Sequence, residues 1–167
     1  MHKVTITLAT LILLALTALS AFAQDAGDSR IKLYAGFING SFDLGIANNQ
    51  GVNAAAQLKL YGYEGVRLEA AGDFSGYLRG GDKVYIYLAG PQVSFDLFEG
   101  RLTPFARILF GATRYEGHTS YAHSIGGGLD VNVSDHFFVR PFQYDKQSTD
   151  KYPQPIHRIG AGIGLRF

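Results

Sequence analysis

One short segment of the chain combines the residue types of a nucleophilic catalytic site. Glu116, His118 and Ser120 fall within five residues. A serine hydroxyl becomes a nucleophile when a histidine takes its proton and a carboxylate orients that histidine. These three residues occupy a predicted junction between a loop and a strand, which is a poor place to fix such a geometry. The nearby His123 and Ser124 point to opposite faces of a predicted strand. We therefore predict no catalytic residue and expect that the chain is not an enzyme.

Metal and cofactor chemistry has no matching pattern in the sequence. The chain has no cysteine, and no His-Glu-x-x-His or equivalent ligand spacing occurs. Apart from His2, the histidines are scattered along the chain: His118, His123, His136 and His157. The glycines of 126–128 and 160–164 lack the helix and the Lys-Ser/Thr pair of a phosphate-binding loop. We interpret them as space for Arg and Tyr side chains, and predict no metal and no cofactor.

The N-terminus has the pattern of a cleaved export signal. Lys3 is followed by an apolar run over 6–19 and by Ala-Phe-Ala at 21–23, a small-x-small cleavage pattern. We predict a signal peptide over 1–23 and one domain over 24–167. Removing 1–23 removes one basic residue and no acidic one, so 14 basic and 14 acidic residues remain. Because nucleic-acid binding requires a basic excess, we predict no nucleic-acid partner.

After residue 24 the chain shows the two-residue period of β-strands and no helical period. Eight segments alternate in this way: 31–37, 53–61, 66–73, 85–95, 103–113, 121–133, 137–145 and 157–167. Short connections at 62–65, 97–101 and 134–136 alternate with longer ones at 38–52, 75–83, 114–120 and 146–155. This order predicts an all-β, eight-stranded antiparallel up-and-down barrel. A change of phase around Pro141, which has no N–H, predicts a β-bulge there.

The alternation by itself does not say which face lines the barrel. A soluble lipocalin-like barrel has its apolar face inside, whereas a transmembrane barrel has it outside. The polar face carries charges of both signs, as pairing inside a narrow lumen would require: Lys32, Lys59, Arg67, Glu69, Asp73, Arg107, Asp130, Arg140, Asp145, Arg158 and Arg166. We favour the transmembrane barrel, with Leu58, Ile108 and Ile163 facing outward. Eight strands leave a lumen that side chains fill, so we expect a plug and no open pore.

Tyrosine is frequent near the predicted rims. Such residues form the aromatic girdles of transmembrane barrels, and we predict that role for Tyr34, Tyr61, Tyr63, Tyr77, Tyr115, Tyr121, Tyr144 and Tyr152.

The C-terminal sequence Gly-Ala-Gly-Ile-Gly-Leu-Arg-Phe, at 160–167, resembles the insertion signal of bacterial outer-membrane barrels. The stretches 87–95, 103–111 and 125–131 resemble strands of small OmpA-like barrels of the outer-membrane β-barrel, or porin-like, family. The likeness covers nearly all of 30–167. It implies eight antiparallel strands, the bacterial outer membrane as location, and insertion by the outer-membrane assembly machinery through Phe167.

On this basis we expect a small outer-membrane barrel with a structural or surface-interaction role. Its partners would be outer-membrane lipid and lipopolysaccharide, with extracellular loops at Ile38–Gly51 and Lys146–Pro155 as contact sites whose ligand is unknown. Two alternatives stay open. One is a soluble periplasmic lipocalin-like binding barrel. The other is an outer-membrane lipid-modifying enzyme, because lipid A deacylases are also eight-stranded and use a His, a Ser and a carboxylate.

Overall fold

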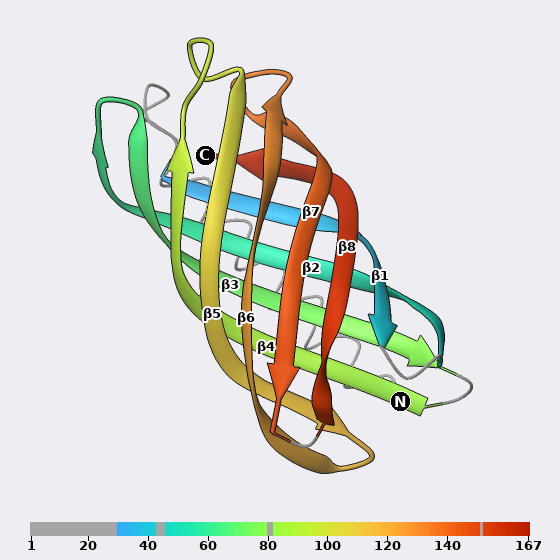
Figure 1. The fold of residues 1–167 in the computed structure, drawn as a ribbon. Coiled ribbons are helices and arrows are strands. Elements are labelled where there is room, and N and C mark those ends of the chain that lie inside the picture. The colour runs from blue at the N-terminus through green and yellow to red at the C-terminus, as the bar shows by residue number, and fades with distance from the viewer. Residues whose placement is uncertain (1–29, 43–45, 80–81, 151) are drawn as a thin grey trace, which may run out of the picture.

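The chain folds into one closed antiparallel barrel of eight strands (Figure 1). The computed structural model describes residues 30–42, 46–79, 82–150 and 152–167, so the predicted signal peptide at 1–23 lies outside the described residues. The strands are β1 (Ile31–Phe42), β2 (Ile46–Tyr63), β3 (Val66–Arg79), β4 (Asp82–Phe95), β5 (Leu102–Tyr115), β6 (His118–Asn132), β7 (Phe137–Thr149) and β8 (Tyr152–Arg166). The fold class predicted from the alternation is confirmed.

Closure of the barrel depends on the pairing of β1 with β8. Their register runs from Lys32 opposite Arg166 to Phe42 opposite Ile156. At the end of this seam the N–H of Ile31 donates to the carbonyl of Phe167 at 3.0 Å, and the N–H of Phe167 donates back at 2.8 Å. The C-terminal residue therefore completes the ladder, and the sheet has no open edge. We call this end of the barrel, where Ile31 and Phe167 lie, the terminal end, and the opposite end the far end.

Tight turns join the strands at both ends of the barrel. Glu64-Gly65 and Glu116-Gly117 have consecutive positive φ values of 46° and 79°, and of 48° and 81°. Two left-handed residues match the twist of a hairpin, and glycine adopts that conformation without steric cost. The turn between β4 and β5 is longer and lies at the terminal end, with the turns before β3 and β7 (upper end in Figure 1).

The predicted long connections at the far end are wrong in length. Strands β1 and β2 extend through most of 38–52, and β7 and β8 extend through most of 146–155. The same holds for 75–83 and 114–120. In these segments polar residues and glycines occupy both faces, so the apolar alternation that marks a strand fades. The ladder continues because backbone pairing does not require apolar side chains.

The bulge predicted at Pro141 is confirmed. Between Arg140, opposite Gly162, and Gln143, opposite Gly160, β7 has one residue more than β8. Pro141 and Phe142 both point outward as a result, and no ladder hydrogen bond is needed from the proline nitrogen. A second shift in β2, between Lys59 and Tyr61, was not predicted.

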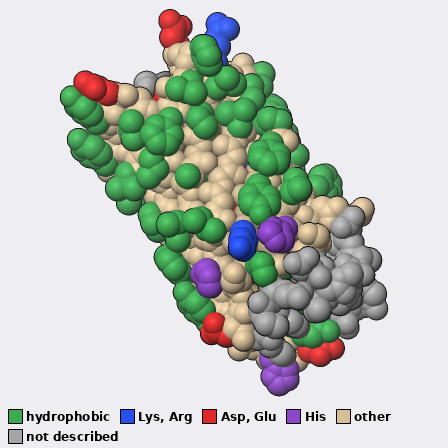
Figure 2. All heavy atoms as spheres, in the orientation of Figure 1, with side chains coloured by type: hydrophobic (Ala, Val, Ile, Leu, Met, Phe, Trp, Pro, Cys, Tyr) green, Lys and Arg blue, Asp and Glu red, His purple; other side chains and the backbone are tan. Residues whose placement is uncertain are grey.

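The barrel is apolar outside and charged inside. Leu58, Ile108 and Ile163 are 46–54% exposed, whereas Arg107 and Arg158 are at most 2% exposed. Figure 2 shows hydrophobic side chains over much of the outer wall. A soluble barrel buries such side chains, so the alternative of a lipocalin-like fold is wrong, and the outward apolar band is the pattern of a transmembrane barrel. Within the described residues, no helix is long and apolar enough to cross a membrane.

Two of the tyrosines predicted for the girdle lie elsewhere. Tyr34 and Tyr77 point into the barrel and are buried. They fill space above glycines of the same wall, because a Cβ at Gly36 would collide with the Tyr34 ring and one at Gly40 would press on the Tyr77 ring. In contrast, Tyr61 is exposed, as a girdle residue should be.

A charge placed on the outer wall tests this arrangement. We expect Ile108→Arg to lower the free energy of unfolding in lipid vesicles by about 2–4 kcal/mol, because the guanidinium would enter the hydrocarbon core. Val133→Arg, at an exposed position in the β6–β7 turn, should lower the free energy of unfolding by about 0–1 kcal/mol. Urea titration followed by circular dichroism measures both, since the chain has no tryptophan. Equal losses in the two variants would contradict a lipid-facing Ile108.

Candidate functional site

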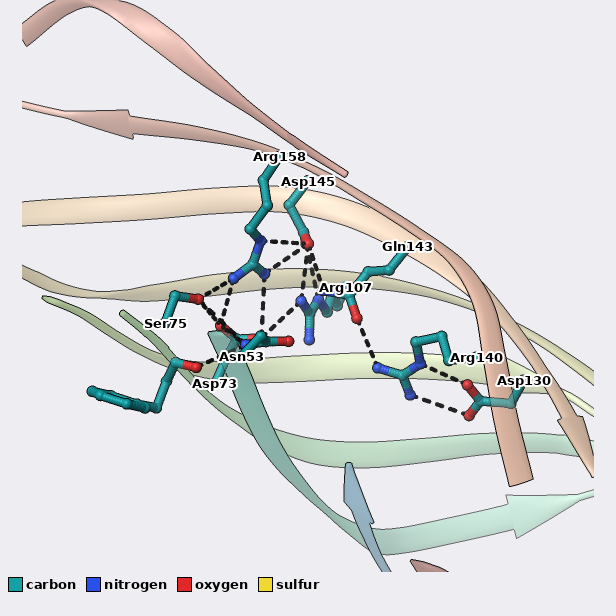
Figure 3. A network of polar contacts seen from close by, with 10 residues as sticks. Asn53, Asp73, Ser75, Arg107, Asp130, Arg140, Gln143, Asp145 and Arg158 are labelled. Carbon is teal, nitrogen blue, oxygen red and sulfur yellow. Dashed lines mark hydrogen bonds and ion pairs between the residues drawn. The ribbon is translucent and has the colours of Figure 1, made fainter. Parts of the chain in front are cut away.

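The centre of the lumen holds a ring of two arginines and two aspartates from four strands (Figure 3). Arg107 Nη2 lies 2.9 Å from Asp73 Oδ2, and Arg107 Nε lies 3.0 Å from Asp145 Oδ1. Arg158 Nη1 lies 2.8 Å from Asp73 Oδ1, and Arg158 Nη2 lies 2.7 Å from Asp145 Oδ2. Each carboxylate is thus shared by two guanidinium groups. We call Asp73, Arg107, Asp145 and Arg158 the central quartet.

Neutral side chains add hydrogen bonds to the two aspartates of the quartet. Asn53 Nδ2 and Ser75 Oγ each donate to Asp73 Oδ1 at 3.1 Å. Gln143 Nε2 donates to Asp145 Oδ2 at 2.9 Å. A buried carboxylate is tolerated only when its oxygens are paired and hydrogen-bonded. The two aspartates of the quartet meet that condition.

Backbone packing leaves room for the quartet. Asp145 stands opposite Arg158 in the β7–β8 register and opposite Gly126 in the β6–β7 register. A Cβ at Gly126 would collide with the Asp145 side chain. The predicted role of the lumen glycines as space for other side chains is therefore confirmed here. The predicted residue types are wrong, because the side chains that use the space at 126–128 and 160–164 are not Arg or Tyr but Asp145, Phe105, Ile38 and Phe138.

A second cluster lies toward the terminal end and is built around Arg140. Its Nε and Nη2 donate to the two oxygens of Asp130 at 2.7 and 3.2 Å. Its Nη1 donates to Gln143 Oε1 at 2.8 Å, and Gln143 connects it to the quartet. The guanidinium carbon also lies 4.3 Å from the ring centroids of both Tyr34 and Phe105. Such a planar cation held between two rings requires arginine, because lysine has neither the bidentate geometry nor the flat face.

A third cluster closes the network at the terminal end. Lys32 Nζ lies 3.6 Å from Glu69 and 3.7 Å from Asp130. Gln92 Nε2 donates to Glu69 at 2.6 Å. Arg67 Nη2 contacts Asp96 at 2.9 Å, near the mouth. Together the three clusters pair the lumen cations with acidic partners along the barrel, as a low-dielectric interior demands.

Toward the far end the described buried side chains are uncharged, and an apolar cluster lies there beside neutral polar residues such as Ser124 and Gln147. Leu109 lies two residues beyond Arg107 on β5, and Tyr77 lies four beyond Asp73 on β3. These residues belong to one buried cluster: Ile38, Ala71, Tyr77, Ile86, Leu88, Leu109 and Ala122. The lumen is therefore filled by an ion-paired network followed by an apolar layer.

The predicted charged face is confirmed for most of its members. Lys32, Arg67, Glu69, Asp73, Arg107, Asp130, Arg140, Asp145 and Arg158 are all buried inside the barrel. Lys59 is half-buried, and Arg166 lies at the mouth, where it donates to the carbonyls of Asp135 and Ser134. The apolar layer and the packing of Arg140 between the Tyr34 and Phe105 rings were not predicted. The only signal for the layer was that Ile86 and Leu88 disturb the alternation of β4.

The candidate nucleophilic residues lie at the far end, away from this network. Glu116 is in the β5–β6 turn, exposed His118 begins β6, and Ser120 is half-buried. Among the described residues, no hydrogen bond joins any two of them. Ser124 is buried inside and His123 is exposed outside, as predicted. The described residues also hold no group of three His, Cys, Asp or Glu suited to a metal ion.

Solved structures that are similar to the chain include small bacterial outer-membrane proteins. Ail, the attachment invasion locus protein of Yersinia pestis, matches with a TM-score of 0.56 and 20% identity over 83% of this chain and 97% of Ail. The chain has the fold of a small outer-membrane β-barrel. Neisserial surface protein A (NspA) matches with a TM-score of 0.55 and 17% identity over 82% of this chain and 96% of NspA. OprG of Pseudomonas aeruginosa matches with a TM-score of 0.52 and 9% identity over 83% of this chain and 96% of OprG. No protein-family model and no curated protein matches the chain.

Removal of one quartet member tests the energetic role of the network. We expect Arg158→Ala to lower the free energy of unfolding by about 3–5 kcal/mol, because two buried aspartates each lose a partner. Arg114→Ala, which removes an exposed arginine of β5, should change it by about 0.5 kcal/mol or less. Urea unfolding in the same lipid measures both. If Arg158→Ala lowers the free energy of unfolding no more than Arg114→Ala does, a structural role for the quartet is contradicted.

Proposed function

We propose that the chain is a non-conducting, non-enzymatic barrel of the bacterial outer membrane, with a structural or surface-interaction role. The observation that carries this proposal is the filled lumen. The central quartet crosses the interior through four ion pairs of 2.7–3.0 Å, and the apolar layer follows it. A barrel of eight strands whose interior is packed in this way supports anchoring, not passage of solutes.

The outer wall supports a location in the membrane. Exposed aromatic residues lie near the terminal end at Tyr61, Tyr63 and Phe95, and farther along the barrel at Tyr87 and Tyr121. Between these levels the wall carries aliphatic side chains such as Ile108 and Ile163. Two aromatic levels around an aliphatic band suit the two interfaces of a bilayer. Phe167 completes the ladder beside Ile31, and we propose that the assembly machinery recognises it there.

The far-end hairpins are the proposed contact surface. The hairpin of β1 and β2 and that of β7 and β8 contain the segments Ile38–Gly51 and Lys146–Pro155. Described residues of these segments, such as Asn39, Gln50 and Lys146, are exposed on paired strands, which suits recognition of a lipopolysaccharide or host surface. We propose that Ser120 does not act as a nucleophile, because Glu116 and His118 are not hydrogen-bonded to it.

Planar-bilayer recording tests the closed lumen. We expect the reconstituted chain to give no large steady current, because the quartet and the apolar layer block the axis. A sample that shows heat-modifiable migration on a gel provides the control for folding and insertion. Large and stable currents from that sample would overturn the proposal of a closed lumen.

Shortening of the far-end hairpins tests the contact surface. We expect a strain whose chain has both hairpins trimmed in register to show the adhesion and detergent sensitivity of a deletion strain. The trimmed barrel should reach the outer membrane in normal amounts, because the ion-paired lumen is unchanged. Full complementation by the trimmed chain would show that the hairpins are not the contact surface.

A further inference from the structure

The outer wall is hollowed where β8, β1 and β2 lie side by side. Two adjoining hollows of about 430 and 750 Å³ share Phe37 and Ala161 in their lining. Ala35 and Ala54 lie in the larger one, where short side chains leave the wall recessed between larger neighbours. Volumes of about 300–1,000 Å³ are typical of sites for small molecules.

The chemical character of the hollow changes along the barrel. The larger part is lined mainly by apolar groups, among them Phe37 and Ile163. The smaller part, nearer the far end, is also lined by Asn39 and Gln50. These two amides are opposite each other in the β1–β2 register, and both are exposed. An occupant of the whole hollow must therefore be apolar at one end and polar at the other.

Basic side chains lie just beyond the polar end. Asn39 is opposite Ile159, and two residues along β8 His157 stands opposite Lys146. Lys146 is exposed, and no carboxylate within the described part of the chain is paired with it. Figure 2 shows a Lys or Arg side chain close to His side chains on the outer wall that faces the viewer. A positive charge thus stands beyond the polar end of the hollow, two residues along β8 from its lining residue Ile159.

The imidazole of His157 is held in position for a ligand. Tyr144 Oη lies 2.7 Å from His157 Nδ1, and the two rings are 6.0 Å apart. When the tyrosine hydroxyl donates to Nδ1, the proton of the neutral ring is on Nε2. That N–H can then donate to an anionic oxygen beside the ammonium group of Lys146, and lysine is a common partner of phosphate.

We propose that this part of the wall, which we call the β8–β1 groove, binds lipid A. The occupant must join a phosphate to acyl chains and must reach the wall from the outer leaflet. The proposal rests on the membrane location proposed above, with the far end outside. Lipid A is the phosphorylated, acylated glycolipid of that leaflet. Its phosphate would lie between Lys146 and His157, a sugar hydroxyl or amide beside Asn39 and Gln50, and one acyl chain over Ala161 and Ala54.

Methyl NMR of the full chain in phosphatidylcholine nanodiscs tests the groove, with purified lipid A as the titrant. We expect saturable shifts of the alanine methyls at Ala35, Ala54 and Ala161. The outward alanines Ala89 and Ala106, on β4 and β5, should not show them. Equal shifts on both walls would mean unselective lipid contact and would overturn the proposal.

Two pairs of variants locate the head and the tail of the ligand. Lys146→Gln should weaken lipid A binding about fivefold, the effect of one cation near an anionic headgroup. Arg114→Gln should leave lipid A binding unchanged. The residue opposite Arg114 on β6 is Thr119, which lies six residues, or about 20 Å, from Ile125, the residue opposite Lys146. Ala161→Leu should weaken binding by filling the groove, whereas Ala106→Leu should not. Unchanged binding in both Lys146→Gln and Ala161→Leu would overturn the site.

A second titrant and a folding control separate the remaining outcomes. Phosphatidylglycerol carries a phosphate and acyl chains but no sugar amides, and equal affinity for it would overturn lipid A as the ligand. Heat-modifiable migration reports insertion. A chain that does not insert would refute the proposed membrane function, whereas an inserted chain without selective shifts refutes only the β8–β1 groove.

Discussion

The structure depends on one constraint, which is that a strand in hydrocarbon must pair its backbone on both sides. An unpaired N–H or C=O there costs several kcal/mol, so the sheet must close. The β1–β8 seam meets this requirement as far as the reciprocal hydrogen bonds of Ile31 and Phe167. Closure with eight strands also fixes the width of the lumen, and a narrow lumen has to be filled by the side chains that point into it.

Filling that lumen with charged groups imposes a second requirement. A guanidinium or carboxylate away from water is tolerated only when its charge and its hydrogen bonds are matched. The two aspartates of the central quartet satisfy both demands, because each meets two arginines and also accepts a hydrogen bond from a neutral side chain. Gln143 joins the quartet to Arg140, so the network is continuous from the middle of the barrel toward the terminal end. The same contacts that stabilise the fold also occlude the axis.

The two faces of the wall therefore have different functions. The interior is occupied by its own contacts, which leaves the outer wall and the far end for interactions with other molecules. On the outer wall the recess at Ala54 and Ala161 is followed, along the strands toward the far end, by the basic pair Lys146 and His157. Along the strands the outward side chains change from apolar, to the amides of Asn39 and Gln50, to the cation of Lys146, and this order gives the proposed selectivity for a lipid.

The sequence by itself determined the number of strands, the face of most residues in the eight predicted strand segments, and the bulge at Pro141. Those features follow from local alternation and from the missing N–H of proline, which need no knowledge of distant residues. Only the tertiary structure decided that Arg107 pairs with both Asp73 and Asp145, since those contacts span 34 and 38 residues of sequence. It also decided that Tyr34 and Tyr77 turn inward over glycines, and that the strands continue through most of the predicted far-end connections. Partners across a closed barrel are set by register and curvature, and a pattern with a period of two residues carries neither.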